Sequence, residues 1–443
     1  MIVKEWQPLY NQIMKFAVSD VIKKIVLTLS IVLLCSCKSK KNQIADARRL
    51  QTIQNARQGL EYINLVKNQK NQAVETFIDG LPLEEKVAQL FVVNLVGCDE
   101  FIPVEENIAG GFLYFGYNIA QTPFEMQHFN QSVINYCKAN GKIPPFLTVD
   151  QEGGFVNRLR SLNGPLPSAQ RVSEKLDVAQ TDELYTMQAL QMKALGFTMN
   201  LAPVAEVCTP DNEVFLNQRS FGNLEQVKLY GGACVHAYES NGVGTVLKHF
   251  PGNTNTDPHT GLPEIKWSEQ EMKMQLEGFK ALVQKNPSAV LMSHARVNGY
   301  DEKNPACLSH YWVTDILRNE LGFEGIIFSD DIFMGALADN GYPPEVAVVA
   351  AIEAGIDCIM ISEKRIDSSV KILCRKAKTD SDFAGLIDKA VRRIIDYKLN
   401  CGFLSIELDD SGQYGVVIHY PEFTGQGFEE AKEMNVKLYM ENF

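Results

Sequence analysis

The stretch Gly325-Ile326-Ile327-Phe328-Ser329-Asp330-Asp331 decides the fold, because it is a short apolar run that ends in acidic residues. Seven other short runs rich in Val, Ile, Leu and Phe recur at 90–96, 110–115, 146–149, 197–202, 244–248, 288–293 and 356–361. Runs that are continuously apolar are typical of parallel strands covered on both faces. Amphipathic segments of helix length lie between most of them, at 123–139, 182–195, 223–240, 268–285 and 310–321. Eight alternating units in about 320 residues predict an α/β fold whose strands close into a (β/α)8 barrel of the TIM type.

The main alternative to the barrel is an open, doubly wound sheet, which binds nucleotide phosphates at a glycine-rich loop after one of its strands. No such loop follows any of the eight apolar runs. A chain of 443 residues with 45% hydrophobic side chains buries one large core or two modest ones. The formal net charge of −12 makes nucleic acid and anionic membrane surfaces poor partners, so we expect no nucleic-acid ligand.

The N-terminal segment is unlike the rest of the chain. Lys23 and Lys24 precede an apolar run at 25–34, and Leu34-Cys35-Ser36-Cys37 closes that run. A basic patch, an apolar stretch of about ten residues and small residues before a cysteine predict an export signal that is too short to span a bilayer. Its ending resembles a bacterial lipoprotein signal, which implies that Cys37 is lipidated and becomes the new N-terminus. The alternative interpretation is an uncleaved anchor helix or a buried apolar segment.

Four segments follow from these patterns. We expect a lipoprotein signal peptide at 1–36, a tether or helical spacer at 37–78, the barrel at 79–404 and a C-terminal appendage at 405–443. Membrane association is expected only through the N-terminal lipid, which anchors the exported protein to the bacterial cell envelope on its periplasmic or outer-surface side. We expect the protein to be a monomer.

Charged and imidazole side chains gather where the predicted strands end, and in this architecture the site forms at the carboxyl ends of the strands. They are Asp150 after the third strand with Arg158 just beyond it, Lys248 and His249 after the fifth, His294 after the sixth and Asp330 after the seventh. A polar pocket that has acids, bases and imidazoles but no metal or nucleotide signature suits a neutral polyhydroxylated ligand. The sequence therefore predicts a sugar-binding site that uses no cofactor and no metal.

Two side chains are candidates for chemistry on a sugar. Glycoside hydrolysis requires an anion that traps an oxocarbenium-like centre and an acid that protonates the leaving oxygen. Asp330 is the candidate anion, because it closes a rigid strand, and a side-chain period of two turns Asp331 to the other side; the alternative is that both acids only cap the next helix. The candidate acid is His259, since Asp257 is close enough in sequence to hold its second ring nitrogen. An Asp-Pro-His triplet is most often a turn, but its place just after the fifth strand favours a catalytic dyad.

Several long stretches of the chain carry a family resemblance. They are Leu83-Glu84-Glu85-Lys86-Val87-Ala88-Gln89-Leu90, Asp150-Gln151-Glu152-Gly153-Gly154, Lys248-His249-Phe250-Pro251-Gly252 and Ser329-Asp330-Asp331-Ile332-Phe333-Met334. Together they resemble glycoside hydrolase family 3, in its β-N-acetylglucosaminidase branch, over roughly residues 79–404. The resemblance implies a retaining hydrolase that releases non-reducing terminal β-linked N-acetylglucosamine, with a covalent intermediate on Asp330 and an Asp257/His259 acid/base dyad.

The same resemblance implies the sugar-binding residues. Those that match family sugar ligands are Asp150, Arg158, Lys248, His249 and, within Arg219-Ser220-Phe221-Gly222, Arg219. His294 is added because it ends the sixth strand.

Four departures from the family pattern lie in the loops around this site. Pro251-Gly252-Asn253-Thr254 stands in place of Pro-Gly-His-Gly, and Asp257-Pro258-His259 in place of Asp-Ser-His. Phe155 stands where the family often has Arg, and Glu206 where Asp is usual. None of these changes removes a catalytic group.

Two other functions remain open at this point. The same site can pass the sugar to phosphate instead of water, because a histidine acid/base, unlike a glutamate, does not repel an incoming phosphate anion. The stretch between Pro251 and the dyad is also about two residues shorter than the family pattern, which allows a glycan-binding envelope lipoprotein with a degenerate site. For the hydrolase, the substrate is either a cell-wall fragment or a chito-oligosaccharide.

Overall fold

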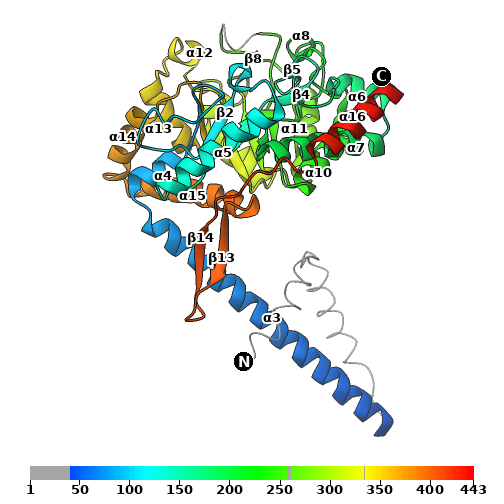
Figure 1. Cartoon of the computed structure of the whole chain (residues 1–443), viewed down its shortest axis with the longest axis vertical. Coiled ribbons are helices and arrows are strands. Elements are labelled where there is room, and N and C mark those ends of the chain that lie inside the picture. The colour runs from blue at the N-terminus through cyan, green and yellow to red at the C-terminus, as the bar shows by residue number, and fades with distance from the viewer. Residues whose placement is uncertain (1–39, 257–260, 334) are drawn as a thin grey trace. The chain divides into compact units, whose positions relative to one another are not determined.

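The computed structural model describes residues 40–256, 261–333 and 335–443, and its central element is a parallel β-barrel (Figure 1). Each of the eight apolar runs contributes one strand. The strands are β1 (Phe91–Asn94), β2 (Gly111–Tyr114), β3 (Phe146–Val149), β6 (Met199–Asn200), β7 (Gly244–Phe250), β9 (Ala289–Met292), β11 (Ile326–Phe328) and β12 (Ile359–Ile361). Neighbours are parallel in the order β11-β9-β7-β6-β3-β2-β1-β12, and a bridge between Phe328 and Cys358 brings β11 next to β12. The predicted (β/α)8 barrel is confirmed, and the open doubly wound sheet is excluded.

The barrel interior is a packed apolar core that holds the strand ends in place. The ring of Phe146 on β3 meets that of Phe328 on β11 edge to face, with the ring centroids 6.0 Å apart, and both side chains are fully buried. Other strand residues of this core are Val92, Leu113, Met199, Val246, Ala289, Leu291, Ile326 and Met360. Truncating one such aromatic residue typically costs about 3–5 kcal/mol, so the strand ends are rigid supports for the side chains that follow them.

Helices flank the strands, and capping residues determine where several of them begin (Figure 1). α5 (Pro123–Ala139) begins at a capping box formed by Thr122 and Glu125, and α11 (Glu269–Val283) at one formed by Ser268 and Glu271. The other long helices of the barrel unit are α7 (Val178–Leu195), α10 (Gly232–Ser240), η4 (Tyr311–Glu320), α13 (Pro344–Ala354), α14 (Asp367–Ala377) and α15 (Ser381–Asn400). The shorter helical elements are α4 (Leu83–Gln89), η1 (Gly116–Asn118), α6 (Ala169–Lys175), α8 (Glu213–Leu216), α9 (Leu224–Gln226), η2 (Val227–Gly231), η3 (Ala306–Leu308) and α12 (Gly335–Ala338).

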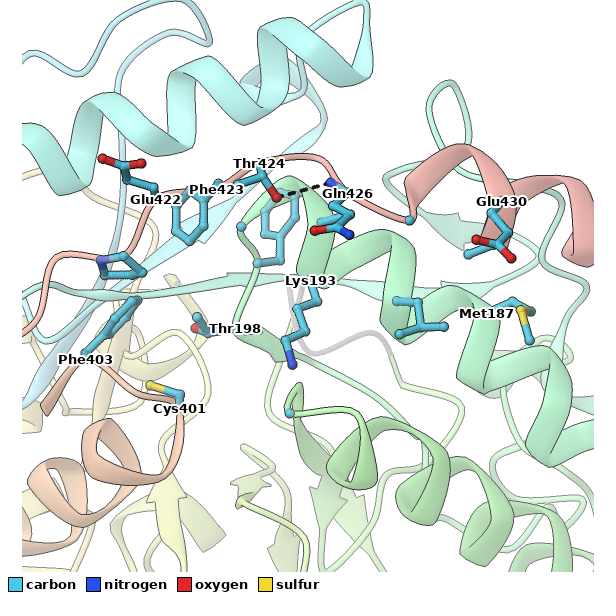
Figure 2. Close-up of a pocket in the computed structure, with 18 of the residues that line it drawn as sticks. Met187, Lys193, Thr198, Cys401, Phe403, Glu422, Phe423, Thr424, Gln426 and Glu430 are labelled. Atoms are coloured by element: carbon cyan, nitrogen blue, oxygen red, sulfur yellow. Dashed lines mark hydrogen bonds between the residues drawn. The ribbon is translucent and has the colours of Figure 1, made fainter. Parts of the chain in front are cut away.

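The chain after the barrel ends in a small sheet and a helix. β13 (Leu404–Leu408) pairs with β14 (Tyr414–Ile418), and α16 (Phe428–Asn442) packs beside α7, where Gln180 Nε2 donates to Asn442 Oδ1 at 3.2 Å. A groove of about 710 Å³, lined in part by Phe403 and Phe423, lies between α7 and the segment that leads into α16 (Figure 2). Thr198, which precedes β6, also lines this groove. The groove therefore lies where the barrel strands begin, at the opposite end from the predicted site.

The segment before the barrel belongs to a different compact unit. Among the described residues, contacts define two compact units, one of residues 40–75 with Leu408–Gly415 and the other of Thr76–Glu407 with Val416–Phe443. Helix α3 (Lys40–Gly80) covers residues 40–78 of the predicted spacer. The predicted signal peptide and Cys37 lie outside the described residues, so both stay predictions. Over the described ranges, no helix has both the length and the apolarity that crossing a bilayer requires.

Candidate active site

A buried network of charged side chains lies where β3 and β7 end. Lys248 Nζ is 2.6 Å from Asp150 Oδ1 and 2.6 Å from Glu152 Oε1. Arg219 holds Glu152 from the other side, because its Nε donates to Oε2 at 2.7 Å and its Nη2 donates to Oε1 at 2.9 Å. Three predicted sugar ligands, Asp150, Lys248 and Arg219, are thus brought together, and Glu152 is the acid that joins them.

The network keeps its charges although it is buried. Burial would raise the pKa of Glu152, but the charges of Lys248 and Arg219 lower that pKa to about 2. Burial would lower the pKa of Lys248, but the acids Asp150 and Glu152 outweigh it and raise the pKa. The side chain of Asp150 is 18% exposed against 3% for Glu152, so Asp150 is the more accessible of the two acids.

His249 stands beside this network and is held by a second acid. Its Nδ1 lies 2.8 Å from Oε1 of Glu206, whose side chain is fully buried. An ionised carboxylate only accepts hydrogen bonds, so Nδ1 is the donor. The ring of Phe215 meets the ring of His249 edge to face at 6.1 Å, and the guanidinium of Arg219 lies over Phe215 at 5.6 Å. Phe215 therefore links the imidazole to the charged network.

Asp330 follows β11 directly. Its carboxylate interacts electrostatically with three other side chains at the rim, which is the end of the barrel where the strands terminate: His294, His249 and Lys248. Burial raises the pKa of Asp330, but His294, His249, the backbone N–H of Asp331 and the ammonium of Lys248 together outweigh burial and hold the pKa below its ordinary value. Backbone N–H of Asp331 donates to Asp330 Oδ1 at 2.8 Å. Asp330 is consequently an ionised carboxylate on a rigid strand end.

The neighbouring acid, Asp331, has different surroundings. Its Oδ1 accepts a hydrogen bond from the backbone N–H of Phe333 at 3.0 Å, and Ser362 also donates to it. Burial is the main influence on Asp331 and raises its pKa. The two adjacent acids therefore differ in their surroundings.

His294 lies behind the two acids. It is fully buried, with Nε2 3.0 Å from the carbonyl oxygen of Asp331 and Nδ1 3.1 Å from the sulfur of Cys307. Both ring nitrogens already have partners in the protein. Its predicted sugar-binding role stays a prediction, while its position makes it a support for Asp330.

Arg158 is the predicted ligand whose side chain is least engaged by the protein. β4 (Gln151–Gly153) and β5 (Val156–Asn157) form a small antiparallel hairpin, and Arg158 follows it, with its backbone N–H donating to the carbonyl of Asp150 at 3.3 Å. Its Nε is buried and finds no hydrogen-bond partner among the described residues. A buried donor without a protein partner is one that a ligand can satisfy.

Two predicted site residues, Asp257 and His259, lie outside the described residues. Two other functional side chains, Phe215 and the acid Glu152, received no role from the sequence. Asp150 and Glu152 are two positions apart in an extended segment, so their side chains share one side, and this spacing is the signal that identifies Glu152. Nothing in the sequence near Phe215 marks it. Within the described ranges, no three His, Cys, Asp or Glu side chains group as metal ligands do.

Comparisons with known proteins agree on one family. The family described as the glycosyl hydrolase family 3 N-terminal domain matches residues 82–397. A β-hexosaminidase of Mycobacterium tuberculosis, LpqI, is 29% identical over 324 residues, which are 71% of this chain and 82% of the relative. A β-hexosaminidase of Vibrio cholerae is 32% identical over 275 residues, 60% and 78% of the two chains. The crystal structure of a β-N-acetylhexosaminidase from Beutenbergia cavernae superposes with a TM-score of 0.64 at 28% identity, covering 72% of this chain and 98% of that one.

Proposed function

This chain belongs to glycoside hydrolase family 3 and is a β-N-acetylhexosaminidase, and we propose that it releases terminal β-linked N-acetylglucosamine by a retaining mechanism. In the first step, an Asp330 oxygen bonds to the anomeric carbon while the glycosidic C–O bond breaks, and His259 gives its proton to the leaving oxygen. In the second step, the imidazole takes a proton from water. The water oxygen then displaces Asp330, and the sugar leaves with its configuration retained.

The state of Asp330 is the observation that carries this proposal. A nucleophilic carboxylate must be ionised and held still, and Asp330 has a lowered pKa and follows a buried strand. Asp331 has a raised pKa, so it is the less readily ionised acid of the pair. The acid/base role of His259, with Asp257 on its second nitrogen, rests on the sequence alone.

The charged network next to Asp330 supports the binding of a sugar. Asp150 offers an acceptor, and Lys248 with Arg158 offers donors, which is the mixture that neighbouring hydroxyl groups require. Because Asp150 and Lys248 are fixed by their ion pairs, these two groups need little reorganisation when the substrate binds.

Product analysis with purified enzyme tests the proposal. Wall muropeptides, chito-oligosaccharides and a chromogenic β-N-acetylglucosaminide are each supplied, with Asp330→Asn as the control variant. We expect free N-acetylglucosamine, formed first as the β-anomer, from the unmodified enzyme only. Sugar 1-phosphate formed when phosphate is added would show a phosphorylase, and no turnover of any substrate would favour the glycan-binding alternative.

We also propose that the enzyme is exported and lipid-anchored through Cys37. The basic patch, the short apolar run and the Leu-x-Ser-Cys ending support this anchor. Two or more acyl chains are needed for stable anchoring. Expression in a bacterial host fed a labelled fatty acid should label the native chain in the membrane fraction, and Cys37→Ala should abolish the label.

A further inference from the structure

The geometry points to Glu206 as a positioning residue that holds His249 and the start of the loop after β7 in their catalytic arrangement. This inference rests on the proposed function. The carboxylate of Glu206 is fully buried and accepts four hydrogen bonds. Two come from His249, from Nδ1 at 2.8 Å and from the backbone N–H at 3.3 Å. Two come from Asn253, from the backbone N–H at 2.7 Å and from Nδ2 at 3.2 Å.

All four donors lie in one short segment of chain. A buried carboxylate is tolerated only where donors replace the water it has lost, so the bonds to Glu206 determine where this segment runs. His249 ends β7, and Asn253 begins the loop that continues toward the acid/base positions. A single side chain thus fixes both a sugar-binding imidazole and the beginning of the loop.

Glu206 is itself held firmly by its neighbours. The side-chain amide of Gln275, on α11, bonds to both backbone groups of Val207: its Oε1 accepts from the N–H at 2.9 Å, and its Nε2 donates to the carbonyl at 2.8 Å. The hydroxyl of Ser220 donates to the carbonyl of Glu206 at 2.6 Å. Since a positioning residue acts only as rigidly as its own backbone is held, these bonds are what the role requires.

Asn255 forms a second set of hydrogen bonds that holds the same loop in place. Its Oδ1 accepts from the backbone N–H of Val214 at 2.9 Å, its Nδ2 donates to the carbonyl of Pro210 at 2.9 Å, and its own N–H donates to the carbonyl of Asp211 at 2.7 Å. The segment 210–214, to which Asn255 is hydrogen-bonded, leads directly into Phe215, whose ring contacts that of His249. The loop after β7 and the sugar-binding imidazole are therefore connected through this segment.

A loop that delivers a proton donor matters most when the leaving group needs that proton. A dinitrophenolate departs without protonation, whereas a sugar hydroxyl does not. The test compares kcat/KM for a 2,4-dinitrophenyl β-N-acetylglucosaminide and for di-N-acetylchitobiose, because kcat/KM reports the first, bond-breaking step. The variants are Glu206→Gln, which keeps the shape but sets an amide N–H against the N–H of Asn253, and Asn255→Ala.

Glu239 provides a matched control. It is another largely buried glutamate with four hydrogen bonds, from the N–H and hydroxyl of both Thr245 and Ser288, but it lies where β7 begins. Glu239→Gln should therefore disturb folding to a similar degree without touching the rim. Melting temperatures and near-ultraviolet circular dichroism confirm that each variant is folded.

We expect Glu206→Gln to lower kcat/KM for chitobiose about 100-fold, the scale of a misplacement of about 1 Å. The loss with the dinitrophenyl substrate should be at least about tenfold smaller. Asn255→Ala should show the same split more weakly, and Glu239→Gln should show none. Equal losses on both substrates, or no loss on chitobiose, would overturn the inference, whereas an unmodified enzyme that turns over neither substrate would contradict the proposed function itself.

Discussion

Replacing Glu152 by Gln removes the one acid that two cations share at the rim. Glu152 sits between Lys248 and Arg219, with oxygen–nitrogen distances of 2.6 to 2.9 Å and a side-chain exposure of 3%. Burial alone would raise its pKa, but the charges of those two cations lower it from 4.5 to about 2. At about 1.4 kcal/mol per pKa unit, the ionised form stabilises the folded protein by about 3 kcal/mol. Breaking a buried ion pair by removing one partner typically costs 3–5 kcal/mol, which agrees.

The sign of the pH dependence follows from the lowered pKa. A carboxylate whose pKa is lower in the folded than in the unfolded protein stabilises the fold. This stabilisation is complete above the unfolded-state pKa, and it is lost as the pH falls through the folded-state pKa. Here the window runs from about pH 4.5 down to about pH 2. About 1 kcal/mol of this stabilisation should be gone by pH 3.5, so the difference in free energy of unfolding between the natural enzyme and Glu152→Gln should narrow by that amount.

Urea unfolding followed by tryptophan fluorescence measures this difference, because urea is uncharged and does not screen the ion pairs. The exposed Glu106→Gln is the control and should lie within about 0.5 kcal/mol of the natural enzyme. A loss at pH 7 below about 1 kcal/mol for Glu152→Gln, or a gap that is unchanged at pH 3.5, would refute the reasoning.

Three further predictions concern single rim residues. His294→Gln removes the strongest electrostatic influence that lowers the pKa of Asp330, so the acid limb of the kcat/KM profile should move to higher pH; a limb that stays in place contradicts this. Phe215→Leu removes the ring between His249 and Arg219 and should raise KM about three- to tenfold, with exposed Phe124→Leu as an unaffected control in the same steady-state assay. Arg158→Ala should lower kcat/KM about 100-fold and move the melting temperature by no more than about 2 °C, because its buried Nε loses no protein partner; a large drop in melting temperature would show a structural role instead.

The barrel was predictable because its signals are local. Each apolar run formed a strand, although the run at 197–202 gives only Met199–Asn200 as β6. Beyond β6 the chain stays beside β7, where the backbone N–H of Lys248 donates to the carbonyl of Pro203 at 3.2 Å and Val204 forms a bridge with Lys248. The place of Asp330 could be predicted equally well, because it follows directly from the end of an apolar strand and needs no knowledge of distant contacts.

The rest of the site depends on contacts between distant segments. Glu206 lies 43 residues from His249 and 47 from Asn253, so its four hydrogen bonds arise only from the register in which β7 meets the chain after β6. Phe215 likewise comes from the short helix α8, whose position the spacing of residues alone does not determine. Such residues carry no periodic signal in the chain, and their roles follow from the fold.

Covalent trapping tests the central claim most directly. A 5-fluorinated N-acetylglucosaminyl fluoride reacts quickly and leaves slowly, so the enzyme should accumulate as the glycosyl adduct, and mass spectrometry of the digested protein should find the sugar on Asp330. Loss of activity should parallel labelling, and Asp330→Asn should take up no label. A sugar found on any other side chain, or a product of inverted configuration with no adduct, would contradict the account.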